Sequence, residues 1–92
     1  MLTKTVKVIS EYGIHMKPCA LIVDVAQEYN SDIIINKRDG TKGDAKSMLD
    51  IAIMAIAKGE ELSITADGID EDEAVDALIA LIQNDFDKIL TE

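Results

Sequence analysis

The spacing of apolar residues switches repeatedly between two periods, and this constrains the fold more than any other sequence feature. Residues 2–9 and 61–66 place apolar side chains at alternate positions, which is typical of a strand buried on one face. Residues 16–29 repeat them every three or four positions, as an amphipathic helix does. The chain is therefore expected to divide into short strands and helices that alternate.

A hairpin is predicted in the middle of the chain. Residues 33–36 are expected to form a short apolar strand, and Arg38-Asp39-Gly40 carries an Asp-Gly turn signal. A second short strand is expected near residues 41–45.

Two more helices are predicted in the second half. Ser47 is expected to open a helix through Ile56, which Lys58 and Gly59 would close. Residues 70–76 are rich in acidic side chains, which are favourable at the positive end of a helix dipole. They therefore predict the start of a last helix, which is expected to extend to Leu90. Its expected core face consists of Ala74, Ala77, Leu78, Leu81 and Ile82.

The predicted order is β-α-β-β-α-β-α, which places the chain in the α+β class. We expect a single domain over residues 1–92, with a four-stranded antiparallel sheet covered by helices on one face. A domain of this length buries only about 60–65% of the surface of its unfolded chain. Its functional chemistry is therefore expected at the surface.

Composition excludes several classes of partner. Nine basic and eighteen acidic residues give a net charge of −9, which repels nucleic acid and anionic membranes. The longest apolar runs fall far short of the roughly 20 residues of a membrane span. A single cysteine cannot form an internal disulfide, so we expect a cytoplasmic protein. We find no zinc spacing or phosphate-binding glycine loop, and we expect no metal or cofactor.

His15 is the leading candidate for chemistry. It follows Gly13 and precedes a predicted helix, whose first N–H groups lack intrahelical acceptors and attract anions. A phosphoryl group on the imidazole would lie over those donors, and Lys17 adds a positive charge nearby. The competing interpretation is a surface histidine that caps the helix poorly. Metal ligation is disfavoured, because the chain has no second histidine.

Other residues near helix starts have two interpretations each. Cys19 is either a small buried residue or an exposed thiol four positions from His15. Ser47 begins a Ser-x-x-Asp pattern, a variant of the capping box, and is also a place where a phosphate would add charge. Met16, Leu21, Met48 and Leu49 either pack in the core or offer an adaptable binding surface.

Two motifs resemble one family. Residues 13–20, Gly-Ile-His-Met-Lys-Pro-Cys-Ala, resemble the active-site segment of HPr, the histidine-containing phosphocarrier of the bacterial phosphotransferase system. Residues 46–49, Lys-Ser-Met-Leu, resemble its regulatory-serine segment, and the likeness extends over nearly the whole chain. The resemblance implies an open-faced β-sandwich with four strands and three helices.

The resemblance also implies a function. Enzyme I, charged from phosphoenolpyruvate, would phosphorylate His15 at Nδ1, and the group would pass to a IIA domain or a regulatory target. A dedicated HPr kinase would modify Ser47 and slow this transfer. The protein would be a monomeric phosphoryl carrier and not an enzyme. We expect its partners to contact Met16, Cys19, Ala20, Met48 and Leu49.

The sequence departs from the family pattern around the motif. Lys17 stands where arginine is usual, which keeps the charge but loses the planar bidentate fork. Positions that are often basic in sugar-transport members hold Asp24, Gln27 and Asp50. These acidic and neutral residues weaken complementarity with acidic partners, so a regulatory or nitrogen-type paralogue is an alternative.

Two other classes share some features. An acyl carrier protein has similar size and acidity, with a serine before Met-Leu at a helix start, but the β-rich pattern argues against its all-helical fold. A small acylphosphatase-like enzyme would need an arginine in a phosphate loop, and the only arginine, Arg38, lies in the predicted hairpin turn.

Overall fold

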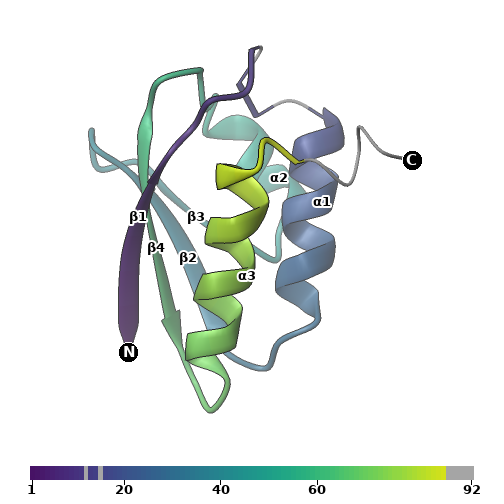
Figure 1. Ribbon diagram of the computed structural model, residues 1–92, viewed down its shortest axis with the longest axis vertical. Coiled ribbons are helices and arrows are strands. Elements are labelled where there is room, and N and C mark those ends of the chain that lie inside the picture. Colours follow the sequence, from purple (N-terminus) through teal and green to yellow (C-terminus); the bar gives the residue numbers. More distant parts are fainter. Residues whose placement is uncertain (12, 15, 87–92) are drawn as a thin grey trace.

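Four strands form one antiparallel sheet, and three helices lie on one of its faces (Figure 1). The computed structural model describes residues 1–11, 13–14 and 16–86. The strands are β1 (Leu2–Lys7), β2 (Asp32–Lys37), β3 (Lys42–Asp44) and β4 (Glu61–Asp67). The helices are α1 (Met16–Gln27), α2 (Met48–Ile53) and α3 (Glu71–Gln83). The predicted α+β class, the element order and the open-faced β-sandwich are confirmed.

Strand β4 lies inside the sheet, whose order is β1-β4-β2-β3. Its residues Leu62, Ile64 and Ala66 are fully buried, as the alternation predicted. Val6 of β1 pairs with Leu62, and Ile35 of β2 pairs with Ile64, so three strands direct their apolar side chains to the same face. Burial of one such large side chain contributes about 1.5–3 kcal/mol to folding.

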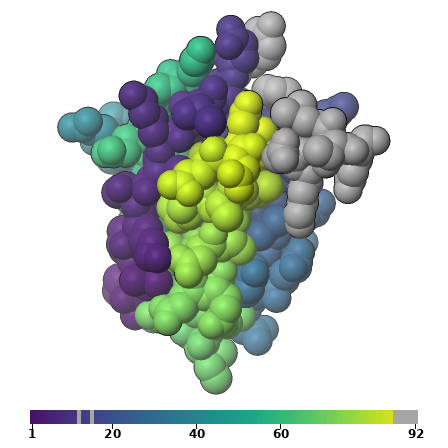
Figure 2. Space-filling model, in the orientation of Figure 1, coloured from purple at the N-terminus to yellow at the C-terminus, as the bar shows by residue number. Residues whose placement is uncertain are grey.

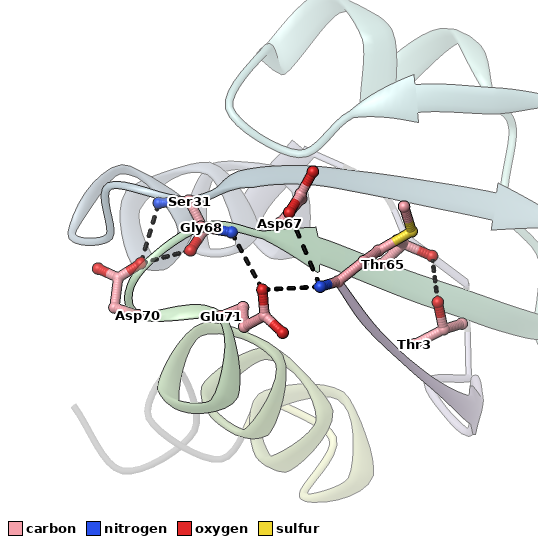
Figure 3. Close-up of polar contacts among 8 residues, drawn as sticks. Thr3, Ser31, Thr65, Asp67, Gly68, Asp70 and Glu71 are labelled. Carbon is pink, nitrogen blue, oxygen red and sulfur yellow. Dashed lines mark hydrogen bonds and ion pairs between the residues drawn. The ribbon is translucent and has the colours of Figure 1, made fainter.

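The opposite face of the sheet carries polar side chains. Thr3 of β1 and Thr65 of β4 pair across the strands, and their hydroxyl groups lie 2.8 Å apart in a hydrogen bond (Figure 3). On the covered face, α3 lies between β1 and α1 (Figure 2). The helices thus close the core from one side only.

Helix α2 is shorter than predicted. It ends at Ile53 instead of Ile56, because Ala55 has a left-handed backbone with φ of 51°. Past this residue the chain turns, and Ile56 becomes part of the core with 4% of its surface exposed. The prediction that Gly59 ends the helix is wrong: it turns the chain into β4, and its N–H donates to the Val8 carbonyl at 2.8 Å.

Helix α3 differs from the prediction in its face and its end. Its buried side includes Val75, while Ala77 is only half-buried. The helix ends at Gln83, because Asp85 and Phe86 both have positive φ values, 53° and 57°. The predicted extension is therefore interrupted, and residues 87–90 lie outside the described part of the chain.

A partly buried polar contact ties the start of α3 to the rest of the fold (Figure 3). One oxygen of the Asp70 carboxylate accepts hydrogen bonds from the Ser31 N–H at 2.9 Å and the Ser31 hydroxyl at 2.5 Å. The other accepts from the Asn30 N–H at 2.8 Å. Ser31 is fully buried. The Ser31 hydroxyl, and after it the Asn30 N–H, lower the pKa of Asp70 because they favour its charged form.

Acid should weaken the fold in part through Asp70. Its folded pKa lies below the value of about 3.9 in an unfolded chain, so its contacts stabilise the fold above that pH. The stabilisation is lost as the pH falls through the folded pKa. Asp70→Asn should lower the urea midpoint at neutral pH and flatten the loss of stability in acid. A variant as acid-sensitive as the parent chain would contradict this.

Candidate functional site

The connection between β1 and α1 leads to His15. The imidazole of His15 lies outside the described residues, but its neighbours Gly13, Ile14 and Met16 are described on both sides. The described backbone on either side shows what the candidate site is built on. Helix α1 begins directly after this position, at one end of the molecule (Figure 1).

Gly13 and Ile14 are held against the segment that follows α2. Gly13 has φ of +72°, and a Cβ atom there would lie 2.4 Å from the Ile56 carbonyl oxygen. The Ile14 N–H donates to that same carbonyl at 2.9 Å, and the Ile14 side chain is 6% exposed. The two residues before His15 thus have little freedom, and only glycine fits at position 13.

Helix α1 begins at Met16, directly after His15. Its first turn contains no acidic residue, so the positive end of the helix dipole is not neutralised by its own side chains. Lys17 is exposed in this turn, and Pro18 is buried there, where its missing N–H removes no intrahelical bond. The first N–H groups of a helix have no acceptor within it, and together with the cation of Lys17 they suit an anionic group.

Cys19 is not available at the surface. Its side chain is 1% exposed, and its sulfur lies 3.7 Å from the Ile14 carbonyl oxygen, to which the thiol donates. Burial raises the pKa of this thiol, which disfavours the thiolate. The prediction that a partner contacts Cys19 is therefore wrong. The residue instead packs beneath the start of α1.

Helices α1 and α2 pack together and leave apolar side chains in solvent. Met16 and Leu49 are each 69% exposed, and Ile53 is 71% exposed. Ala20 and Met48 are half-buried, as is Leu21, which packs against the core. The sequence reasoning missed Ile53, although its place four residues after Leu49 puts both on one face of a helix. We call Met16, Ala20, Met48, Leu49 and Ile53 the apolar surface.

Ser47 caps α2. Its hydroxyl oxygen accepts the Asp50 N–H at 3.2 Å, which is half of the predicted capping box. The Asp50 carboxylate does not complete the box but accepts the Asp44 N–H at 3.0 Å. The Lys46 ammonium donates to the Tyr29 carbonyl at 2.7 Å, and so joins the end of α1 to the start of α2.

The described residues contain no group of three or more His, Cys, Asp or Glu side chains arranged to hold a metal. Among them, no helix has the length and apolar character to cross a membrane.

Comparison with known proteins identifies the class. A family model described as "PTS HPr component phosphorylation site" matches residues 2–84. The chain belongs to the HPr family, the phosphocarrier proteins of the phosphotransferase system.

Individual relatives agree with this assignment. A phosphocarrier protein HPr from Treponema pallidum is 39% identical over 96% of this chain and 99% of its own length. An HPr-like protein Crh from Halalkalibacterium halodurans is also 39% identical, over 92% of this chain and all of its own length. A crystal structure of HPr from Thermoanaerobacter tengcongensis superposes with a TM-score of 0.89 at 33% identity, covering 95% of this chain and 97% of the other.

The contact at Gly13 can be tested by one added methyl group. Gly13→Ala should lower the free energy of unfolding by about 1–3 kcal/mol through strain in the left-handed backbone, and by about 1–3 kcal/mol more through overpacking against Ile56. Gly59→Ala is the matched control, because Gly59 has φ of +88° but no atom within 4 Å of the added Cβ. Urea denaturation should show the larger loss for Gly13→Ala. Equal losses would mean that the approach of Ile56 is unimportant.

Proposed function

We propose that this chain carries a phosphoryl group on His15, accepts it from Enzyme I and delivers it to a IIA domain or a regulatory target. The observation that carries the proposal is the bracketed position of His15. The backbone before it is held by Ile56, and the backbone after it begins a helix with no acidic residue in its first turn. Membership of the HPr family supports the same assignment.

The transfer is a displacement at phosphorus. Nδ1 of His15 supplies an electron pair and forms a P–N bond, while the bond between phosphorus and the donor breaks. Delivery reverses this at the acceptor, so the protein is unchanged after a cycle and acts as a carrier, not a catalyst. The N–H groups in the first turn of α1 and the charge of Lys17 would stabilise the phosphoryl oxygens.

Partner proteins are proposed to dock on the apolar surface. Exposed Met16, Leu49 and Ile53 lose unfavourable contact with water when covered, and methionine adapts to partners of different shape. Ser47 is proposed as the regulatory position because it directly precedes Met48 and Leu49, which belong to this surface. A phosphate there would add about −1.5 to −2 charge beside Leu49 and oppose docking.

The regulatory branch is the second candidate, and a specific observation favours it. Asp24 and Gln27 are exposed on α1, where a basic side chain would attract an acidic partner. Asp50 is half-buried and already accepts a hydrogen bond from Asp44. We propose that the cognate partners present apolar surface with basic residues around it.

The proposal predicts a phosphohistidine. Incubation with Enzyme I and phosphoenolpyruvate should add one phosphoryl group, seen by intact mass, and the product should be labile in acid and stable in alkali. His15→Ala should abolish it. The same yield from His15→Ala would refute the proposal, and acid-stable label would place the group on a hydroxyl instead.

Lys17 should contribute charge to the transfer. Lys17→Arg should keep or raise the rate, because arginine retains the charge and adds a bidentate fork. Lys17→Glu should lower the rate by about tenfold or more, since a carboxylate would repel the phosphoryl group in a partly desolvated interface. Initial rates of phosphorylation by Enzyme I measure both. Equal phosphorylation rates for Lys17→Arg and Lys17→Glu would show that Lys17 has no electrostatic role.

A further inference from the structure

A side-chain hydrogen bond joins the β1–α1 connection to the end of α3. The Ser10 hydroxyl donates to an oxygen of the Asp85 carboxylate at 2.5 Å, and Ser10 is 8% exposed. The two residues are 75 positions apart in the sequence. In Figures 1 and 2 the connection, in purple, passes beside the yellow end of α3.

Two backbone hydrogen bonds of this connection go to a different part of the fold. The Val8 N–H donates to the Glu60 carbonyl at 2.9 Å, and the Ile14 N–H donates to Ile56. Both acceptors belong to the segment between α2 and β4. Ser10 itself accepts the Gly13 N–H at its carbonyl, at 3.0 Å, which closes a turn just before His15. The Ser10 side chain therefore secures that turn from the side of α3.

The backbone conformation and the packing of Phe86 fix the position of Asp85 at the end of α3. Asp85 and Phe86 both have left-handed backbones, which are unfavourable for residues other than glycine. The Phe86 N–H donates to the Leu81 carbonyl at 2.9 Å, and the Phe86 side chain is 2% exposed. Burial of this ring offsets the backbone strain and anchors the turn that directs Asp85 toward Ser10.

We propose that Asp85 is a positioning residue for phosphoryl transfer, acting through Ser10 on the turn that presents His15. This inference rests on the proposed carrier function. Without the bond, Ile14 would keep its contacts with Ile56 and the Cys19 thiol, but the turn between Ser10 and Gly13 would lose its hydrogen bond to the end of α3 and shift from the position that presents His15. Displacement of a reacting group by about 1 Å can cost on the order of 100-fold in rate, so a several-fold to 100-fold loss is expected.

The test compares Ser10→Ala, Asp85→Ala and the double variant, with Asp85→Asn as the conservative change. Asp76→Ala is the matched control, because Asp76 also joins α3 to β1, through Lys4 at 2.7 Å, but at an exposed site away from the turn. The first readout is the rate of phosphorylation by Enzyme I against carrier concentration. The second is amide hydrogen exchange of Gly13 and Ile14 by NMR, which needs no transfer.

Each single alanine variant should lower the maximal rate more than it raises KM, because the docking residues are untouched. The double variant should be no worse than either single variant, and Asp85→Asn should recover part of the rate through its amide oxygen. Gly13 and Ile14 should exchange faster in the alanine variants. Asp76→Ala should change neither readout, even if it lowers the melting temperature.

Wild-type rates in both alanine variants would overturn the inference, and so would a loss equal to that of Asp76→Ala. If the parent chain accepts no phosphoryl group at His15, the carrier function fails, and amide exchange then decides the structural step alone. Unchanged exchange of Gly13 and Ile14 would overturn that step. A variant that unfolds is recognised by its melting curve, and the other member of the pair then supplies the test.

Discussion

The pairing of β4 with β1 on one side and β2 on the other is the constraint on which the structure depends. Each of these strands carries its apolar residues at alternate positions or as a short apolar run, and one register aligns them all. A shift of one residue in β4 would expose Leu62 and Ile64 and bury the threonine face. Only this register gives the sheet a continuous apolar face against which the helices can pack.

The candidate site depends on the same strands indirectly. Val8, which follows β1, donates a hydrogen bond to Glu60 in the segment that leads into β4, and Ile14 donates one to Ile56 in that same segment. The backbone that leads to His15 is thus positioned by the pairing of β1 with β4 and not by α1 alone. A carrier needs such rigidity, because its reacting group must fit several partners without a cavity of its own.

Small size explains why the functional features are at the surface. The chain exposes Met16, Leu49 and Ile53, although burial would stabilise it. A net charge of −9 offsets the tendency of such apolar side chains to associate. In the proposed docking, the exposed Asp24 would lie close to the partner surface, and its charge would disfavour acidic partners.

The sequence alone determined the local features of this protein. Periodicity predicted β1, α1 and β4, a short apolar run predicted β2, and Asp39-Gly40 predicted the hairpin that leads to β3. Ser47 and the acidic residues from Asp70 predicted the starts of the last two helices, and the Gly-Ile-His motif indicated the candidate site. These signals are local, since they arise from side-chain period, backbone sterics and capping within a few residues.

Tertiary structure decided what depends on distant residues. The residues around Ile56 predict that it belongs to α2, but its side chain packs in the core beyond the end of that helix. Cys19 is buried beneath the start of α1, where its thiol contacts the Ile14 carbonyl, and the sequence left open whether it was buried or exposed. The bond between Ser10 and Asp85 joins segments at opposite ends of the chain, and only the closed fold brings them within hydrogen-bonding distance.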